Sequence, residues 1–144
     1  MDITSTPYAE GRVLEFEKEE RIATHLLETF PYDGPRQKIL YETREFSAVC
    51  PYSGLPDYAY LAIEYIPDRA VVELKSLKYY IVSFRNVGIY QEHATKRLYN
   101  DLSALLKPSS LCVKTVYNTR GGIDATCEIR SDAQQPRSHG PDGG

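Results

Sequence analysis

The feature that most constrains the fold is the order in which the hydrophobic period changes along the chain. Apolar and polar residues roughly alternate over residues 37–47 and 58–66, which is typical of half-buried strands. Over about 71–85, and again from Gly88 until Pro108, apolar residues recur every three or four positions, as on one face of a helix. Alternation returns over 111–119 and 122–130.

This order of elements predicts an α+β fold, in which an antiparallel four-stranded sheet carries two helices on one face. Such a sheet leaves two open edges. A neighbouring subunit can cover an open edge by pairing with it, so a ring of subunits that share a continuous barrel is a reasonable hypothesis.

The chain of 144 residues is long enough for one compact domain and too short for two ordinary ones. We divide it into an N-terminal arm (1–36), a folded domain (37–130) and a tail (131–144). The tail is rich in Pro, Gly and Gln, and we expect it to be disordered.

Composition argues against several classes of partner. The formal net charge of −3 makes a nucleic acid an unexpected direct partner. Charged residues crowd positions 15–21, so no apolar stretch there is long enough for a membrane span or signal peptide, and we expect a cytoplasmic protein. The three cysteines form no C-x-x-C pair and the three histidines are scattered, so neither a disulfide framework nor a metal site is expected.

Two residues near the first predicted turn could carry chemistry. Cys50 stands where a strand enters a loop, and Pro51 cannot continue a sheet ladder. A cysteine there could simply fill space in the core, or it could act as a nucleophile. Asp57, seven residues on, could be an ordinary turn residue, or it could lie across the same loop and exchange protons with a reacting group.

Charged residues on the two predicted helices suggest binding functions. On an ideal helix Lys75, Lys78 and Arg85 fall within an arc of roughly 80°, where they could hold phosphates or simply form a solvated face. Glu92, at the start of the second helix, could accept two hydrogen bonds from an amidine-like edge of a guanine base, or could stabilise the helix dipole.

Together, these segments resemble the queuosine-pathway nitrile reductases, the 7-cyano-7-deazaguanine reductases. The resemblance runs from about Phe30 to Arg130. It includes the Cys50 loop, Glu73 to Tyr80, Ser83-Phe84-Arg85-Asn86, Gln91-Glu92 and Arg120-Gly121-Gly122-Ile123. The stretch Glu73 to Tyr80 looks like that family's signature for NADPH use and is the most specific element.

The resemblance implies a tunnelling fold that assembles into multimeric barrels with sites between subunits. It implies NADPH-dependent reduction of the substrate nitrile to an amine, with Cys50 forming a thioimide and Asp57 supplying protons. Glu92 would anchor the deazaguanine ring. The other implied substrate-binding residues are Val72, Glu73, Leu74 and Gln91, and the implied cofactor-binding residues are Lys75, Lys78 and Arg85.

One departure from the family concerns Gln91, which stands where many members have a His that is proposed to help protonate the intermediate. Gln can form hydrogen bonds but cannot exchange a proton at neutral pH. His93 lies two residues further on, roughly 200° around a helix, so it should not be assumed to replace that His.

Three alternatives remain open at this point. Archaeal relatives of the same fold use the thioimide to form an amidine on tRNA, but they lack the lysine-rich stretch. A pterin-forming cyclohydrolase would need zinc ligands that this chain does not assemble in sequence. A non-catalytic purine-binding oligomer would tolerate the loss of Cys50.

Overall fold

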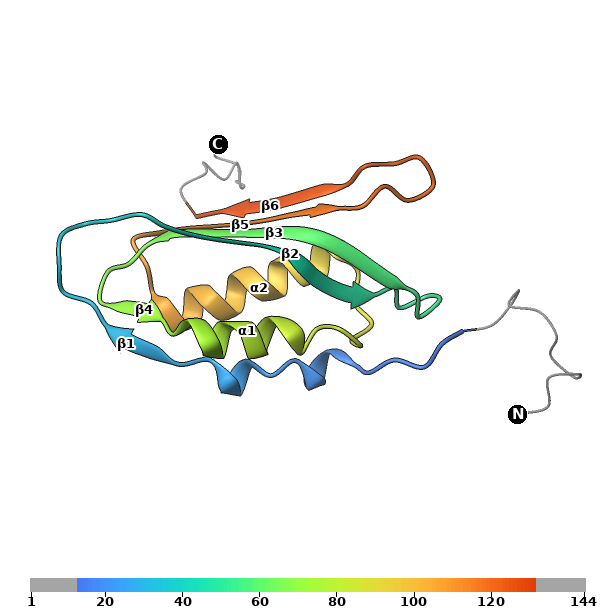
Figure 1. Ribbon diagram of the computed structural model, residues 1–144, viewed down its shortest axis with the longest axis horizontal. Coiled ribbons are helices and arrows are strands. Elements are labelled where there is room, and N and C mark those ends of the chain that lie inside the picture. Colours follow the sequence, from blue (N-terminus) through green and yellow to red (C-terminus); the bar gives the residue numbers. More distant parts are fainter. Residues whose placement is uncertain (1–12, 132–144) are drawn as a thin grey trace, which may run out of the picture.

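The computed structural model describes residues 13–131, which form a four-stranded antiparallel sheet covered by two helices (Figure 1). The strands lie in the spatial order β2-β3-β5-β6. Their bounds are β2 (Ile39–Val49), β3 (Pro56–Ile66), β5 (Ser110–Tyr117) and β6 (Thr126–Arg130). The helices are α1 (Leu74–Val82) and α2 (Gln91–Leu106). The α+β order predicted from the changing hydrophobic period is therefore confirmed.

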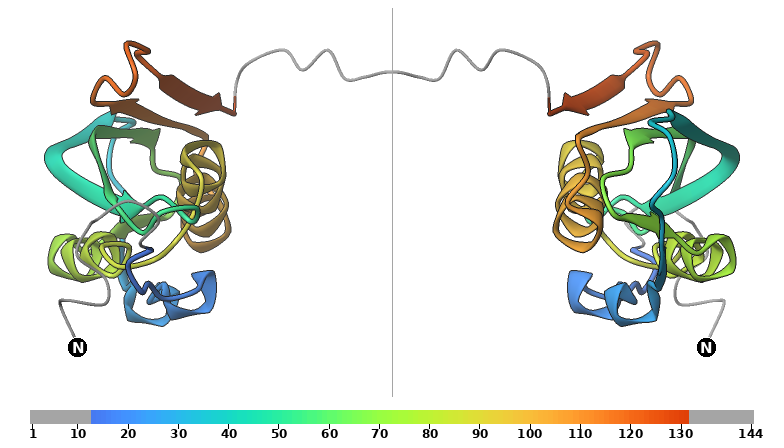
Figure 2. Two further views of the ribbon diagram at one scale, coloured as in Figure 1. Left: turned by 90° about the vertical axis from the view of Figure 1, so that its right-hand side faces the viewer. Right: turned by 90° about the vertical axis from the view of Figure 1, so that its left-hand side faces the viewer.

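Both helices cover the same face of the sheet, and the core lies between them and the strands (Figure 2). Buried and partly exposed residues alternate along β3 and β5, because successive side chains of a strand point to opposite faces. Helix α1 contacts β2, and α2 contacts β5 and β6. The rings of Phe46 and Phe84 meet edge to face with centroids 5.2 Å apart, which joins β2 to the turn after α1.

A second, two-stranded sheet was not predicted. Strand β1 (Thr29–Pro31) pairs antiparallel with β4 (Ala70–Val72). The predicted helix start at Val71 is therefore wrong, since β-branched Val71 and Val72 belong to a strand. Helix α1 begins only at Leu74, where the carboxylate of Glu73 accepts hydrogen bonds from the N–H groups of Ser76 (2.8 Å) and Lys75 (3.2 Å).

Strands β2 and β3 extend further towards their shared turn than the sequence pattern predicted. Ala48 pairs with Asp57, and Val49 pairs with Pro56. Asp57 is therefore the second residue of β3 and not part of the loop, which corrects the predicted strand start at Tyr58.

The last strand is shorter than predicted and begins at Thr126, because residues 118–125 form the connection between β5 and β6.

The described part of the N-terminal arm runs along the helices as two short 3-10 turns, η1 (Glu19–Arg21) and η2 (Thr24–Leu26), followed by β1. Residues 1–12 and 132–144 lie outside the described residues, and with them most of the tail that we expected to be disordered. Ser131, the first tail residue, donates its N–H to the carbonyl of Leu111 at 2.8 Å, which continues the β5–β6 pairing. No helix among residues 13–131 is long and apolar enough to span a membrane.

A hydrogen-bonded cluster fixes the arm to both helices. One carboxylate oxygen of Asp101 on α2 accepts from Tyr80 (2.7 Å), Arg97 (2.8 Å) and Thr24 (2.9 Å). Arg97 also donates to Glu19 at 3.1 Å. The Asp101 side chain is only 14% exposed. If its carboxylate is lost, water therefore cannot easily replace the hydrogen bonds that the three donors make to it.

We expect Asp101→Ala to lower the free energy of unfolding by about 2–4 kcal/mol, since the substitution leaves the Nε–H of Arg97 and the buried phenol of Tyr80 without the acceptor that they share. Urea unfolding followed by circular dichroism measures the change. The matched control is Glu64→Gln, which breaks the exposed pair with Lys38 and should cost less than about 1 kcal/mol. Equal losses in the two variants would contradict a special role for the cluster.

Candidate active site

Cys50 lies in a tight loop that joins β2 to β3. The N–H of Cys50 donates to the carbonyl of Leu55 at 2.8 Å, and the N–H of Gly54 donates to the carbonyl of Cys50 at 2.7 Å. Gly54 adopts a positive φ of 77°, a conformation that favours glycine. The loop therefore turns within residues 50–55 and holds a half-buried thiol at the end of the sheet.

The loop stabilises the thiolate form of Cys50. The N–H of Tyr52 donates to the sulfur at 3.4 Å, and the N–H and hydroxyl of Ser53 lie close enough to lower the pKa of the thiol as well. Burial acts in the opposite direction and is the largest single influence, and the charge of Asp57 opposes ionisation as well. The three donors together outweigh both, so the pKa of the Cys50 thiol is lower than that of an ordinary cysteine. A lower pKa means more thiolate, the nucleophilic form, at neutral pH.

Asp57 lies on the same face of the sheet as Cys50. Ala48 pairs with Asp57, and Cys50 follows Ala48 by two residues, so Cys50 and Asp57 are diagonal neighbours with Cα atoms about 7–8 Å apart. The Asp57 side chain is only 11% exposed and forms an ion pair with Arg120 from the β5–β6 connection. A buried, oriented carboxylate beside a thiol is suited to proton exchange.

Gln91 and Glu92, at the start of α2, lie near the same end of the sheet. The segment before them is hydrogen-bonded to the residue that precedes Cys50, because the N–H of Val49 donates to Val87 (3.0 Å) and the N–H of Ile89 donates to Val49 (3.1 Å). The site therefore brings together Cys50, Asp57, Gln91 and Glu92 from three elements.

Tyr117, the last residue of β5, belongs to this cluster and was not predicted. The burial of its ring raises the pKa of the phenol, and the charges of Asp57 and Glu92 add to this effect, which places both carboxylates near it. Tyr117 is only 4% exposed to solvent, yet its hydroxyl has no hydrogen-bond partner among the residues that the structure describes. The neighbouring hydroxyl of Thr115 pairs with Thr95 at 2.7 Å instead. A buried phenol without a partner leaves one donor available to a ligand at this end of the sheet.

The remaining predicted substrate-binding residues lie at the opposite end of the subunit. The N–H of Val72 donates to the hydroxyl of Tyr65 at 3.1 Å, and Tyr65 lies eight residues along β3 from Asp57. At the rise of a strand this separation is roughly 25 Å. Figure 1 shows β4 and the start of α1 at one end of the sheet and the β2–β3 loop at the other. Val72, Glu73 and Leu74 therefore do not meet Cys50 within one chain.

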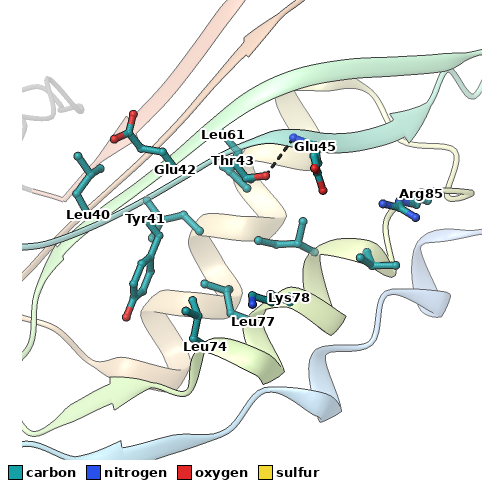
Figure 3. A pocket seen from close by; sticks show the side chains of 13 residues that line it. Leu40, Tyr41, Glu42, Thr43, Glu45, Leu61, Leu74, Leu77, Lys78 and Arg85 are labelled. Atoms are coloured by element: carbon teal, nitrogen blue, oxygen red, sulfur yellow. Dashed lines mark hydrogen bonds between the residues drawn. The ribbon is translucent and has the colours of Figure 1, made fainter.

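A groove of about 500 Å³ lies between β2 and α1, and two of the predicted cofactor-binding residues, Lys78 and Arg85, line it (Figure 3). Its walls are otherwise mostly apolar, with Leu74, Leu77 and Ile81 among them. Two carboxylates also border the groove. These are Glu42 and Glu45. Glu42 points to the far side of β2 (Figure 3), where its carboxylate accepts a hydrogen bond from the hydroxyl of Tyr60 at 2.6 Å.

The predicted cationic face is only partly a helix face. Because α1 ends at Val82, Arg85 lies in the turn that follows the helix, which corrects its predicted place on it. Lys75 is on α1 but does not line the groove, and its ammonium lies 5.8 Å from the centre of the Tyr79 ring. Of the three predicted cationic residues, Lys78 and Arg85 therefore line the groove and Lys75 does not.

Arg120 is a second residue of the site to which the sequence assigned no role. Its guanidinium reaches Asp57 from 63 positions along the chain, and the sequence marked it only as part of the family-like segment Arg120-Gly121-Gly122-Ile123. Among residues 13–131 no group of His, Cys, Asp and Glu side chains is arranged to hold a metal ion.

Comparisons with known proteins show which family the chain resembles. The family model described as "QueF-like protein" matches residues 56–136. A curated relative from Thermotoga petrophila, named NADPH-dependent 7-cyano-7-deazaguanine reductase, is 56% identical over 126 residues, which cover 87% of this chain and 92% of the relative. A relative of the same name from Caldicellulosiruptor bescii is 53% identical over 113 residues, which cover 77% and 86% of the two chains.

Among solved structures, the crystal structure of an apo archaeosine synthase QueF-Like superposes with a TM-score of 0.64 at 24% sequence identity. The match covers 71% of this chain and 99% of that one. At this identity it shows that the fold is shared. The family model spans more than half of the chain and the curated relatives cover most of it, so the chain belongs to the QueF-like family.

Proposed function

We propose that this protein is an NADPH-dependent reductase that converts the nitrile of 7-cyano-7-deazaguanine to an aminomethyl group, a step of queuosine tRNA modification. The names of its relatives supply the reaction. The observation that carries the proposal is the Cys50 thiol, which lies in a loop that favours the thiolate and is a diagonal neighbour of Asp57. A nitrile carbon is an electrophile that a thiolate attacks readily.

Addition to the nitrile requires one sulfur and one proton. The Cys50 sulfur bonds to the nitrile carbon, one π bond of the nitrile breaks, and its electron pair moves to the nitrogen. Asp57 is placed to take the thiol proton and to pass it to that nitrogen, which leaves a neutral thioimide on Cys50. Two molecules of NADPH, bound one after the other, would each supply one hydride to the former nitrile carbon. Once that carbon has received the first hydride and the nitrogen a proton, the carbon–sulfur bond would break with its electron pair moving to sulfur, which returns the thiolate to Cys50 and leaves an imine for the second hydride.

We place the deazaguanine ring near Glu92, whose carboxylate can accept two hydrogen bonds from the amidine-like edge of the base. Gln91 and the unpartnered hydroxyl of Tyr117 are further polar groups at this end of the sheet. Gln91 cannot transfer a proton, so in our proposal Asp57 serves both protonation steps, or solvent serves the second.

The wide separation of Val72, Glu73 and Leu74 from Cys50 leads us to propose that the site is completed between subunits. A second copy could bring its β4–α1 end to the Cys50 end of the first. The open edges of β2 and β6 could then pair into the continuous barrel of a tunnelling fold. We also propose a cytoplasmic protein with residues 37–130 as the catalytic domain.

The groove beside α1 fits a phosphate-bearing cofactor in part. Lys78 and Arg85 would hold phosphate groups of NADPH, and the apolar wall would cover a ring. Lys75 lies on the same helix and could act only from outside the groove.

We expect Lys78→Ala to raise the Michaelis constant for NADPH about tenfold with little change in adduct formation, since the substitution removes a charge that contacts the cofactor. Steady-state kinetics measure the first effect and single-turnover kinetics the second. The control is Lys75→Ala, a lysine of the same helix that is outside the groove, for which we expect a smaller rise. If Lys78→Ala blocked the adduct and left the Michaelis constant unchanged, Lys78 would belong to the substrate site.

Mixing the protein with 7-cyano-7-deazaguanine in the absence of NADPH tests the proposed function directly. We expect a new thioimide absorbance, together with a mass increase equal to one substrate molecule per chain. Addition of NADPH should remove both and release the amine. A protein that binds the base without any mass increase would instead be a non-catalytic binding module.

A further inference from the structure

Residues 14–17, which we call the arm strand, lie against both segments that carry the proposed site. The N–H of Leu14 donates to the carbonyl of Ser53 in the Cys50 loop at 3.0 Å. The N–H of Glu17 donates to Asn86 at 2.7 Å, and the carbonyl of Glu17 accepts from Gly88 at 2.8 Å. The arm strand is therefore bound both to the loop of the nucleophile and to the segment that leads into α2.

The segment 86–89 in turn supports the end of β2. It lies between the arm strand and Val49, with a bridge to Glu17 through Val87 and a bridge to Val49 through Gly88. Val49 is also paired with Pro56 of β3. Val49, the residue before Cys50, is therefore paired with β3 on one side and with segment 86–89 on the other. On the side of segment 86–89, the hydrogen bonds continue to the arm strand.

Two glycines allow the arm strand to approach this closely. A Cβ atom on Gly54 would lie 2.3 Å from the carbonyl oxygen of Leu14, closer than side-chain carbons approach other atoms. A Cβ atom on Gly88 would lie 2.3 Å from two ring carbons of Phe16. The backbone of the arm and the ring of Phe16 therefore occupy the space that side chains would fill at both positions.

We propose that the arm strand positions the Cys50 loop, and that by holding Ser53 it keeps the donors of this loop on the Cys50 sulfur. The proposal rests on the function above in treating Cys50 as the nucleophile. The arm strand touches no reacting atom, so its role is positioning. Ser53 links the two parts, since its carbonyl accepts from the arm and it directly follows Tyr52, whose N–H donates to the sulfur.

The charged groups around the thiol are few. Asp57 opposes ionisation of Cys50, and it is paired with Arg120. Within the arm strand, the carboxylate of Glu17 lies 3.6 Å from the guanidinium of Arg21. Loss of the arm contact should therefore change the thiol mainly through the hydrogen bonds of the loop. With fewer donors, the pKa of Cys50 rises, and less thiolate is present at neutral pH.

The test uses Leu14→Pro in the full chain, because proline removes the N–H that donates to Ser53. The control is Val13→Pro, since the N–H of Val13 donates to no residue of the described range. Phe16→Ala provides a second variant, which loosens the arm at Gly88 and leaves both the N–H of Leu14 and the residues of the loop unchanged. The measurement is the rate of Cys50 alkylation by iodoacetamide between pH 5 and pH 10, followed by peptide mass mapping, with thermal unfolding recorded for each protein.

We expect Leu14→Pro and Phe16→Ala to move the midpoint of the alkylation profile to higher pH and to slow alkylation at pH 7 by a factor of about 3 to 10. Val13→Pro should match the parent. Unchanged midpoints in both test variants, or an equal shift in the control, would overturn the proposal. Alkylation requires neither substrate nor NADPH, so this result is independent of the thioimide experiment that tests the proposed function.

Discussion

Replacing Cys50 by Ala should abolish both the covalent adduct with 7-cyano-7-deazaguanine and the turnover with NADPH. The reason is that the substitution removes the sulfur, the one protein atom that forms a covalent bond to the substrate in the proposed reaction. The fold should persist, because Cys50 is only half-buried and the main-chain hydrogen bonds that close its loop, from Cys50 to Leu55 and from Gly54 to Cys50, do not involve its side chain. Intact-protein mass spectrometry after incubation with substrate measures the adduct, and NADPH oxidation measures turnover.

Cys112→Ala is the matched control for this experiment. Cys112 is also half-buried, but burial raises the pKa of its thiol, so it should be a poor nucleophile at neutral pH. The control should keep both the adduct and the turnover. An adduct that survives in Cys50→Ala and disappears in Cys112→Ala would move the nucleophile to β5 and contradict our assignment.

Asp57→Asn should slow thioimide formation by 10²–10⁴-fold, on the order of 3–5 kcal/mol of barrier, since an amide cannot take the thiol proton and pass it to the nitrile nitrogen. Affinity for the substrate should suffer much less, because Asn keeps the shape and one acceptor. Calorimetry gives the affinity, and stopped-flow absorbance gives the rate of thioimide appearance, for parent and variant under the same conditions.

Asp124→Asn is a suitable control for Asp57→Asn. Asp124 lies in the same β5–β6 connection as Arg120, but unlike Asp57 it is exposed, and its carboxylate accepts a hydrogen bond from Thr119. It should leave the rate and the affinity unchanged. Lost affinity with an unchanged rate of addition in Asp57→Asn would make Asp57 a binding residue, and another group would then supply the proton.

Much of the fold could be predicted from the sequence, because burial imposes a local period. A strand with one face on the core alternates apolar and polar residues, and a helix repeats them every three to four positions. These periods gave the confirmed order of strands and helices. The boundaries were less accurate. Val71 and Val72 fit a helix period, but they pair with β1, and that pairing depends on residues about forty positions away.

The site divides in the same way. The residue types that can carry out the chemistry are visible in the sequence, namely a thiol before Pro51, a carboxylate seven residues later and a carboxylate at the start of a helix. Which of these groups meet depends on the three-dimensional fold. The register of β2 against β3 makes Cys50 and Asp57 neighbours, and the β5–β6 connection brings Arg120 to Asp57. The structure also places Val72, Glu73 and Leu74 at the other end of the subunit, and docks the arm strand on the Cys50 loop. These contacts join distant parts of the chain through backbone hydrogen bonds and ion pairs, and the local spacing of residue types contains no information about such pairings.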